Sequence, residues 1–433
     1  MPQFLTTADA DFEPRLTAIL SMKREDSSDV DATVAAIIAD VRARGDAALT
    51  ELTARFDRLD LTPGTLAFSA AEIDAACASV TAEDRAALEL AADRIRAYHA
   101  RQMPEDAQWT DATGATLGWR WTPVSAAGLY VPGGLASYPS SVLMNAIPAK
   151  VAGVARLVIA CPTPDGTVNP LVLLAARLSG VDTVYRIGGA QAIAALAYGT
   201  ATIAPVDKIT GPGNAFVAAA KRRVFGKVGI DMIAGPSEIL VIADGDNDPD
   251  WIALDLLSQA EHDESAQAIL VTPDPVFADR VVAAVEKRLE TLPRAAIAGI
   301  SWRDFGVVIT TRDLAEAVEI SNRFAPEHLE LCVADPEALV PQIAHAGAIF
   351  LGAWTPEAIG DYIGGPNHVL PTARSARFSS GLSVMDFLKR TTLARMTPES
   401  LAAIGPSAER LAISESLSAH GLSVRARLDR LNG

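Results

Sequence analysis

The sequence Phe-Ala-Pro-Glu-His-Leu-Glu at residues 324–330 joins two segments with different apolar patterns. Before it, the apolar residues of Leu314–Phe324 recur at the spacing of a helix with one buried face. Pro326 fixes its own φ and disfavours the α conformation at the residue before it, so this helix should end just ahead of the proline. The largely apolar run Leu329–Val333 follows at once and is typical of a strand. The stretch therefore predicts a helix-to-strand corner.

Glu327 and His328 lie side by side at this corner, where side chains can point from a rigid scaffold into a cleft. A carboxylate and an imidazole that titrates near neutrality are suited to moving protons. The alternative is a surface Glu beside a structural His at the start of a strand, and the dipeptide by itself favours that alternative. The positions of the other histidines favour a functional pair.

The alternation of helix and strand extends through most of the chain from about Ser140, with a break at Gly235-Pro236. The predicted helices are Ser141–Val154, Pro170–Leu178, Gln191–Tyr198, Asn214–Val224, Trp251–Gln259, Phe277–Leu289, Leu314–Phe324 and Pro336–Ile343. The predicted strands are Leu157–Ala160, Thr183–Ile187, Val206–Ile209, Ile239–Ala243, Ala268–Val271, Val307–Ile309, Leu329–Val333 and Ala348–Leu351. Such alternation implies an α/β fold with parallel sheets covered on both faces. The break predicts two units, with the active cleft between them at the carboxyl ends of the strands.

Outside this region the pattern is simpler. Residues 1–25 are weakly patterned and predict an N-terminal arm. Asp31–Ala43 and Ala70–Gln102 predict amphipathic helices, and His99 in the second should lie on its solvated face. From about Phe387 the tail is predicted to be wholly helical and too short for a core of its own, so it should pack on another domain or another subunit.

Composition excludes several classes of partner. The chain has 433 residues, of which 49% are hydrophobic, and this length is enough for two core domains with smaller appendages. Its net charge of −16 argues against nucleic acid, whose phosphates require a basic face, and against anionic membranes.

The chain shows no sign of export or membrane insertion. The start lacks a basic region followed by a hydrophobic one. The most apolar stretch, Val142–Cys161, is interrupted by a proline and two basic residues. The expected compartment is the cytoplasm. The three cysteines form no C-x-x-C pair, so neither a disulfide framework nor a thiolate zinc site is expected. They are Cys77, Cys161 and Cys332.

Three glycine-rich stretches stand at expected strand ends, over Gly128–Gly134, Ile187–Gln191 and Thr210–Asn214. Free backbone N–H groups where a helix begins bind phosphate or other polar ligands. None of the stretches matches the full dinucleotide fingerprint, because Phe216 takes the position of the third glycine after Gly211 and Gly213. Nucleotide binding and ordinary βα turns are both compatible with this pattern.

A second group of polar residues offers metal ligands. Gln259 and His262 are three residues apart near a predicted helix end and share a face. Asp361 and His368 follow in a glycine-rich segment, and His420 lies in the tail. Histidine with one or two oxygen ligands is a normal zinc set, and an incomplete shell leaves room for a substrate. A set built from Gln259, His262, Asp361 and His420 fits this chemistry, although spacing alone does not bring the four together.

Taken together, these stretches resemble the histidinol dehydrogenase family. The resemblance runs from about Arg24 to the C-terminus, and so many long motifs in the right order are highly specific. The densest motifs are YVPGG with YPSSVLMN (Tyr130–Asn145), IGGAQAIAALAYGT (Ile187–Thr200), ITGPGN (Ile209–Asn214), AGPSE (Ala234–Glu238), LLSQAEHD (Leu256–Asp263), APEHLEL (Ala325–Leu331), GPNHVLPT (Gly365–Thr372) and SGLSV with DF (Ser380–Phe387).

The resemblance implies a zinc-dependent enzyme that oxidises L-histidinol through L-histidinaldehyde to L-histidine, reducing two NAD⁺ at one site, in the last steps of histidine biosynthesis. It also implies a homodimer and two incomplete Rossmann-like domains, which fits the missing fingerprint glycine. The expected domains are an N-terminal helical arm (1–25), a discontinuous zinc and substrate domain (26–127 with 238–385), an NAD-binding domain (128–237) and a small helical dimerisation tail (386–433).

By motif position the resemblance assigns each candidate residue. The zinc ligands, for one ion per subunit, look like Gln259, His262, Asp361 and His420. The catalytic pair looks like Glu327 and His328, and the NAD contacts look like Tyr130, Gln191 and Asn214. The substrate contacts look like Ser237, Gln259, His262, His328, Asp361, His368, Glu415 and His420, with Glu415 and His420 donated by the partner subunit.

The implied chemistry fits these residue types. His328 would take the hydroxyl proton while hydride leaves to NAD⁺, and Glu327 would activate the water that attacks the aldehyde. Three rivals are a related dehydrogenase of another polar alcohol such as a sulfonated diol, a zinc hydrolase with Glu327 as base, and a non-catalytic metal-binding protein. NADH formation with L-histidinol would exclude the first two rivals, and a non-catalytic protein would tolerate loss of the Glu327-His328 pair.

Overall fold

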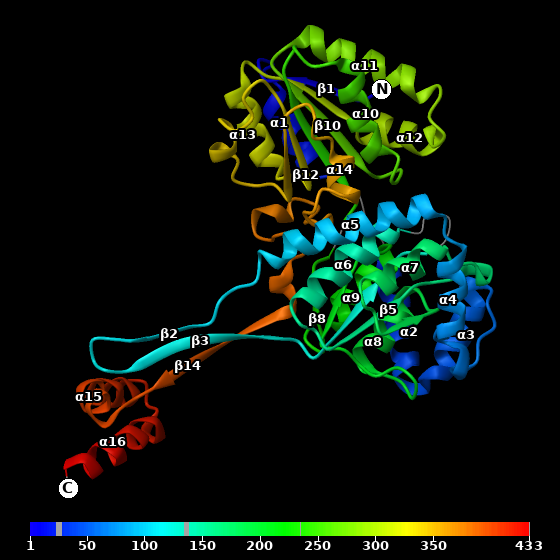
Figure 1. Cartoon of the computed structure of the whole chain (residues 1–433). Helices are drawn as coiled ribbons and strands as arrows, with labels where there is room; N and C mark the ends of the chain where they lie inside the picture. Colours follow the sequence, from blue (N-terminus) through cyan, green and yellow to red (C-terminus); the bar gives the residue numbers. More distant parts are fainter. Residues whose placement is uncertain (23–27, 134–137, 234, 433) are drawn as a thin grey trace.

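The computed structural model describes residues 1–22, 28–133, 138–233 and 235–432. Two α/β bodies lie one above the other, and a small module extends sideways from the lower one (Figure 1). The predicted α/β class with parallel sheets is confirmed. Gly134 of the first glycine-rich stretch, Ala234 of the AGPSE motif and the domain boundary expected at residue 25 lie outside the described residues.

The lower body is built on a five-stranded parallel sheet of order β6-β5-β4-β7-β8. Its strands are β4 (Ala126–Tyr130), β5 (Arg156–Ala160), β6 (Thr183–Tyr185), β7 (Lys208–Thr210) and β8 (Gly229–Ile230). This is the order of a doubly wound nucleotide-binding sheet without its sixth strand. The topological switch point therefore lies between β4 and β7, where such sheets bind their ligands.

Helices bury both faces of this sheet. One apolar cluster lies under α2 (Ser28–Arg44), α3 (Asp46–Asp57), α8 (Gly189–Tyr198) and α9 (Ala215–Val224). A second cluster on the other face lies under α4 (Ala70–Ser79), α5 (Ala82–Ala100), α6 (Pro139–Val151) and α7 (Pro170–Leu178).

The upper body repeats the same plan with one extra strand. Its parallel sheet has the order β1-β11-β10-β9-β12-β13. The strands are β1 (Gln3–Thr6), β9 (Glu238–Ala243), β10 (Gln267–Thr272), β11 (Val307–Thr310), β12 (His328–Cys332) and β13 (Ala348–Leu351). One face packs under α10 (Pro249–Ala260), α11 (Pro275–Leu289) and α12 (Ala295–Phe305), the other under α1 (Phe12–Leu20) and α13 (Leu314–Phe324), and α14 (Glu357–Tyr362) follows β13. No helix in the described ranges is long and apolar enough to cross a membrane.

The expected arm at residues 1–25 is not separate from the bodies. β1 pairs in parallel with β11, and Leu5 is buried in the upper core. Residues 28–57 and the helices α4 and α5 pack on the lower body, where Val34 shares a core with α8 and Ile95 shares one with α6, and not on the upper body as expected. A four-residue strand carries too little periodicity to be recognised, and an amphipathic face does not identify the sheet that covers it.

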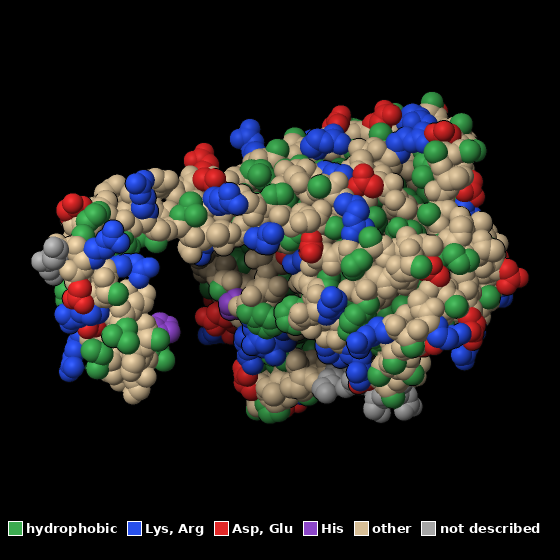
Figure 2. Space-filling view, turned by 90° about the horizontal axis from the view of Figure 1, so that it is seen from below, with side chains coloured by type: hydrophobic (Ala, Val, Ile, Leu, Met, Phe, Trp, Pro, Cys, Tyr) green, Lys and Arg blue, Asp and Glu red, His purple; other side chains and the backbone are tan. Residues whose placement is uncertain are grey.

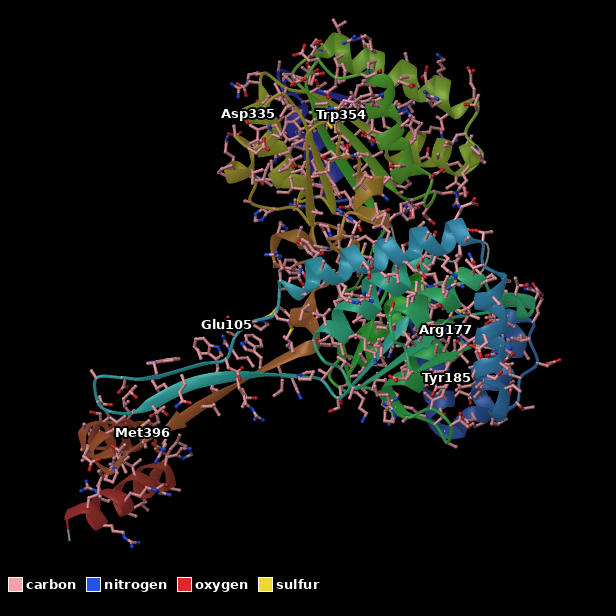
Figure 3. The ribbon with its side chains drawn as sticks, in the orientation of Figure 1. Glu105, Arg177, Tyr185, Asp335, Trp354 and Met396 are labelled. Carbon is pink, nitrogen blue, oxygen red and sulfur yellow. The ribbon has the colours of Figure 1, made fainter. Side chains whose placement is uncertain are left out.

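A three-stranded antiparallel sheet carries the tail away from both bodies. Its order is β14-β3-β2, with β2 (Ala107–Thr110), β3 (Thr116–Pro123) and β14 (Leu388–Arg395). Figure 3 shows Glu105 ahead of β2 and Met396 where β14 meets the helices α15 (Pro398–Ser414) and α16 (Ser418–Asn432). The prediction of a wholly helical tail is wrong for residues 388–395, because this segment pairs with β3 along its full length.

The tail module exposes apolar side chains although it is small. Leu411 and Leu422 are 62% and 66% exposed. Figure 2 shows the module joined to the rest of the molecule along one side, with an open gap beneath the junction. Exposed apolar surface of this kind marks a face that another surface covers.

Candidate active site

One large pocket, of about 860 Å³, is lined by both bodies. The lower body contributes the carboxyl ends of its strands, through Tyr130 at the end of β4 and residues 211–214 after β7. The upper body instead presents amino ends, because Ser237 precedes β9 and Glu327 and His328 stand at the start of β12. The predicted position between the two units is confirmed. The expectation of carboxyl ends is wrong for the upper sheet, since a helix-to-strand corner lies at the amino end of its strand.

The corner between α13 and β12 is held by packing. The helix ends at Phe324, as predicted, and Ala325 takes a left-handed conformation with φ 48° and ψ 60°. Ala325 is fully buried, and its N–H donates to the carbonyl oxygen of Ser321 at 2.8 Å. A residue with a Cβ rarely adopts this conformation unless its surroundings impose it. The backbone leading into Glu327 is therefore fixed.

His328 lies buried in the pocket wall. Its Nδ1 is 3.0 Å from the carbonyl oxygen of Glu238, which only accepts, so Nδ1 carries the proton. Nε2 is then the basic nitrogen, and it has no hydrogen-bond partner among the described residues. Burial lowers the pKa of His328 to about 4. The imidazole is therefore neutral near pH 7 and ready to accept a proton.

Glu327 lies beside His328 and is also buried. Its Oε2 accepts the backbone N–H of Glu238 at 2.9 Å and lies 3.7 Å from His328 Nδ1. The bond across β9 and β12 holds the carboxylate where it lines the pocket. A fixed carboxylate next to a neutral imidazole offers two separate bases at one place.

Three of the four predicted metal ligands come from the upper body. Gln259 is fully buried one turn before His262, and neither end of its amide has a hydrogen-bond partner among the described residues. His262 and Asp361 line the pocket, and Asp361 Oδ1 lies 3.9 Å from His328 Nε2. A buried amide oxygen left unpartnered is costly unless something binds it. Together with an imidazole and a carboxylate it fits the donor set that zinc takes.

His420 and Glu415 do not join these residues within one chain. Both are exposed in the tail module, Glu415 directly after α15 and His420 in α16. The module lies far from α14, which carries Asp361 (Figure 1). Their donation by a partner subunit stays a prediction.

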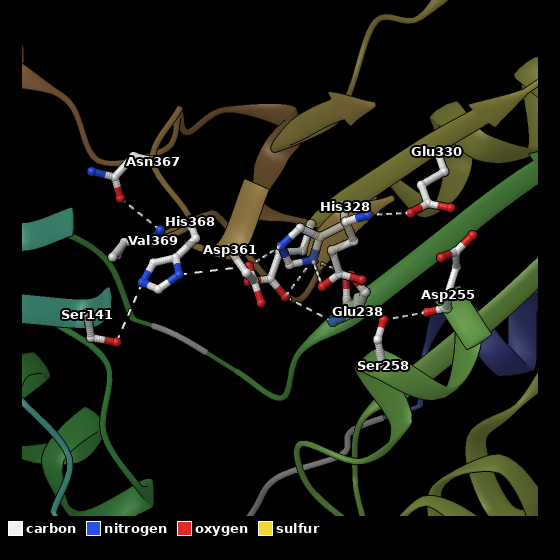
Figure 4. A network of polar contacts seen from close by, with 12 residues as sticks. Ser141, Glu238, Asp255, Ser258, His328, Glu330, Asp361, Asn367, His368 and Val369 are labelled. Atoms are coloured by element: carbon white, nitrogen blue, oxygen red, sulfur yellow. Dashed lines mark hydrogen bonds and ion pairs between the residues drawn. The ribbon is translucent and has the colours of Figure 1, made fainter. Parts of the chain in front are cut away.

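His368 lies where the two bodies meet. Its Nε2 is 3.5 Å from Ser141 Oγ on α6, and its Nδ1 is 3.8 Å from Asp361 Oδ1 (Figure 4). Burial lowers the pKa of His368, so its ring is neutral near pH 7. Ser237 lines the same pocket. Ser237 and His368, two of the predicted substrate contacts, therefore line the same pocket as the predicted catalytic pair.

The predicted NAD contacts line the lower half of the pocket. The Tyr130 hydroxyl accepts the N–H of Gly189 at 3.1 Å, and burial raises the pKa of Tyr130 to about 12. Gln191 stands in the first turn of α8. Asn214 caps α9, and its Oδ1 accepts two N–H groups of the first turn at 3.1 and 3.2 Å. Two helix N-termini thus border the pocket, and such termini favour bound phosphate.

Known proteins match this chain over its length. The family model described as histidinol dehydrogenase matches residues 20–428. The histidinol dehydrogenase of Cereibacter sphaeroides is 81% identical over 432 residues, with 100% of both chains covered, and that of Rhodospirillum rubrum is 65% identical over 431 residues, with 99% of both covered. The chain belongs to the histidinol dehydrogenase family. The crystal structure of histidinol dehydrogenase from Elizabethkingia anophelis, at 37% identity, superposes with a TM-score of 0.95 over 100% of this chain and 99% of that one. The resemblance noted in the sequence is confirmed.

The prediction that His99 lies on a solvated helix face is wrong. His99 is fully buried, because α5 is covered on the face that carries it. Its Nδ1 lies 2.8 Å from the carbonyl oxygen of Ile95 and its Nε2 lies 3.3 Å from Asn367 Nδ2. The carbonyl only accepts, so Nδ1 carries the proton and Nε2 accepts from the amide.

Asn367, which His99 helps to hold in place, in turn positions its neighbour His368. Its Nδ2 also donates to the carbonyl oxygen of Met144 at 2.6 Å, and its Oδ1 accepts the N–H of Val369 at 2.9 Å. The segment that precedes it is tied to α5 as well, since Arg94 Nε donates to the carbonyl oxygen of Ile363 at 2.6 Å. Helices of the lower body thus hold the loop that carries His368. The GPNHVLPT motif identified the loop, but nothing in the sequence pairs it with α5.

A buried ion pair between Lys221 and Asp231 holds the turn at Gly211. The two side chains are only 3% and 1% exposed. Lys221 Nζ donates to the carbonyl oxygen of Gly211 at 3.0 Å, and Asp231 Oδ2 accepts the N–H of Gly211 at 2.8 Å. Gly211 has φ 111°, and a Cβ there would collide with the backbone of Tyr130. No periodic pattern marks this pair, so sequence reasoning missed it.

Buried carboxyl groups stand behind His328 (Figure 4). Glu357 Oε1 lies 3.4 Å from His328 Nδ1, and the Glu357 N–H donates to Glu330 Oε1 at 2.6 Å. Burial raises the pKa of Glu357 and Glu330 well above their usual range and that of Asp255 to about 6. Like charges this close cannot all ionise in a buried site.

Proposed function

We propose that this chain oxidises L-histidinol through L-histidinaldehyde to L-histidine, with two NAD⁺ as hydride acceptors and one zinc ion per subunit. Family membership makes the chain an oxidoreductase of histidine biosynthesis. The observation that carries the chemistry is the neutral, buried His328, whose Nε2 is unpartnered among the described residues, beside Glu327. We place the enzyme in the cytoplasm, in keeping with three buried free thiols.

The residues around the pocket fit a zinc ion. We assign it to Gln259, His262 and Asp361 with His420 of the partner subunit, and the unpartnered amide of Gln259 supports this set. When bound, zinc supplies an electrophilic centre that holds and orients the substrate nitrogen atoms.

The protein groups then move the protons. His328 Nε2 takes the hydroxyl proton of histidinol as hydride leaves to NAD⁺. Glu327 removes a proton from the water that adds to the aldehyde, and His328 accepts the proton released in the second oxidation. Ser237 and His368 bind the polar groups of the substrate, and Glu415 of the partner subunit binds its ammonium group. A site covered by a second chain keeps the aldehyde away from bulk solvent.

We infer a homodimer, and the position of the tail supports this inference. The module that carries Glu415 and His420 exposes Leu411 and Leu422 and stands clear of its own pocket. Subunits that carry His328→Asn should therefore complement subunits that carry His420→Asn. In the mixed dimer one site receives both substitutions and the other receives neither, so random mixing should restore about a quarter of wild-type activity. Mixtures as inactive as each variant alone would contradict tail exchange.

NADH absorbance with NAD⁺, zinc and L-histidinol, beside a chelated sample, tests the proposed reaction. NADH formation that is lost on chelation and restored by zinc supports substrate, cofactor and metal together. NADH from a sulfonated diol or another polar alcohol, with none from histidinol, would assign the chain a different substrate. Absence of NADH formation with every alcohol would favour a zinc hydrolase that uses Glu327 as its base.

A further inference from the structure

The end of α3 brings an unpartnered carboxylate to the lower half of the pocket. Asp57 lines the pocket and is 8% exposed. Its Oδ2 is buried and has no hydrogen-bond partner among the described residues, whereas the backbone N–H of Thr163 bonds to this carboxylate. The Oγ1 of Thr163 is also buried without a partner in the described part of the chain. An acceptor and a hydroxyl left open at the same place are costly unless a ligand satisfies them.

The topology identifies what belongs at this place. In a doubly wound dinucleotide site, an acid near the end of the second strand binds the hydroxyl groups of the adenosine ribose. Here β4 is the first strand and β5 the second, by their order in the sheet. The residues after β5 are Cys161, Pro162 and Thr163, and none of them is acidic. Asp57 reaches the same strand end from α3, outside the β4–β8 unit.

The surrounding backbone leaves little room for a larger group. A Cβ on Gly133 or on Gly188 would collide with Pro162, so the two glycine turns and the end of β5 crowd together. Tyr130, whose hydroxyl accepts the Gly189 N–H, lies in the same corner. A dinucleotide that reaches this corner passes over the start of α8 before it meets Asp57.

Charge at this corner disfavours a second phosphate. Arg58 is the neighbouring cation, and its Nε donates to Asp165 Oδ1 at 2.7 Å. The cation is therefore engaged away from the pocket by an exposed acid. A carboxylate without a free cation beside it binds a ribose hydroxyl and repels a 2′-phosphate.

We propose that Asp57 is a specificity-determining residue that accepts hydrogen bonds from the adenosine ribose hydroxyls of NAD⁺ and excludes NADP⁺. This rests on the NAD⁺ dependence proposed above. The role differs from that of the predicted NAD contacts. Gln191 lies in the first turn of α8, Asn214 caps α9, and the Tyr130 hydroxyl bonds to the first residue of α8. It assigns cofactor choice to a helix that the sequence places outside the glycine-rich region.

Direct binding of NADH and NADPH to the zinc-loaded enzyme, followed by fluorescence, tests this assignment without turnover. Asp57→Ala should weaken NADH binding about ten- to hundred-fold, since a charge-assisted hydrogen bond is lost. Asp57→Asn keeps the size and an acceptor for the Thr163 N–H, and it should lower the preference for NADH over NADPH at least about tenfold. The KM for L-histidinol should change little in both variants. Asp60→Asn is the matched control, because Asp60 is a nearby exposed acid that does not line the pocket.

The outcomes separate this inference from the proposed function. Wild-type protein that binds neither dinucleotide overturns both. Wild-type protein that binds NADH, together with Asp57 variants of unchanged melting temperature and unchanged NADH and NADPH affinities, overturns the role of Asp57 alone. If Asp57→Ala does not fold, the NADPH affinity of Asp57→Asn decides, and an unaltered NADH preference in that variant would contradict the assignment.

Discussion

Replacing Glu327 with Gln should separate the two oxidations. The amide oxygen of Gln has the same reach and can still accept the Glu238 N–H that the carboxylate accepts at 2.9 Å. Exchange of a charged for a neutral acceptor costs about 1 kcal/mol of stability, so the variant should fold. What it loses is the ability to remove a proton from water.

The expected magnitude follows from the proposed role of Glu327 as a general base. General base catalysis contributes about 10²- to 10⁴-fold, which corresponds to about 3–5 kcal/mol of activation free energy. That loss should fall on oxidation of the aldehyde. The first oxidation should stay within a few fold of wild type, because the carbonyl oxygen of Glu238, 3.0 Å away, fixes the His328 tautomer, whereas Glu327 Oε2 is 3.7 Å away.

Single-turnover NADH formation, measured separately from L-histidinol and from L-histidinaldehyde, gives both rates. His328→Asn is the matched control and should depress both steps, since the same nitrogen accepts a proton in each. An equal loss in both steps for Glu327→Gln would refute the separate role of Glu327.

Three further perturbations probe other parts of the account. In the metal-free protein, burial lowers the pKa of folded His328 to about 4, whereas an unfolded histidine titrates near 6.5. The unfolded state therefore binds more protons below about pH 6.5, and His328 should lower the free energy of unfolding by about 2 kcal/mol between about pH 7.5 and pH 5. Urea unfolding of His328→Asn should show a pH-dependent loss of stability that is smaller by this amount. His99→Phe removes the acceptor for Asn367 and should raise the KM for histidinol about tenfold without changing the KM for NAD⁺. His99→Gln should restore the wild-type KM for histidinol. A lowered melting temperature with an unchanged KM would show that His99 has a purely structural role. Removing zinc should abolish NADH formation yet leave the NADH dissociation constant within about twofold, because the proposed NAD contacts and the proposed metal ligands lie on opposite bodies. Loss of NADH binding on chelation would contradict that separation.

The helices and strands with a periodic apolar pattern could be predicted from the sequence. Those that form only through pairing or packing with another part of the chain could not. Periodicity located most helices and strands of both bodies, and Pro326 located the end of α13. β1, β2, β3, β8 and β14 were missed, because each becomes a strand through pairing with a neighbouring strand and carries little pattern of its own. The predicted helix Pro336–Ile343 is wrong, since this segment forms only a short 3₁₀ turn over Val340–Gln342. The assignment of α2, α3, α4 and α5 failed for the same reason, since an apolar face is the same whichever sheet covers it.

The candidate site shows the same division. Residues with distinctive chemistry in distinctive motifs, such as Glu327, His328 and Asp361, were predicted and line one pocket. Residues that act through buried contacts were not, because their roles depend on which groups the fold brings beside them. His99 was expected in solvent and is buried against Asn367, and Asp57 has no motif at all.

The number of NADH molecules formed from each molecule of L-histidinol shows whether one pocket carries out both oxidations. With limiting histidinol, excess NAD⁺ and zinc-loaded enzyme, the account predicts two NADH per histidinol, with histidine as the product and no aldehyde trapped by an added carbonyl reagent. One NADH per histidinol, with the aldehyde released into solution, would contradict a single pocket in which Glu327 and His328 carry both oxidations.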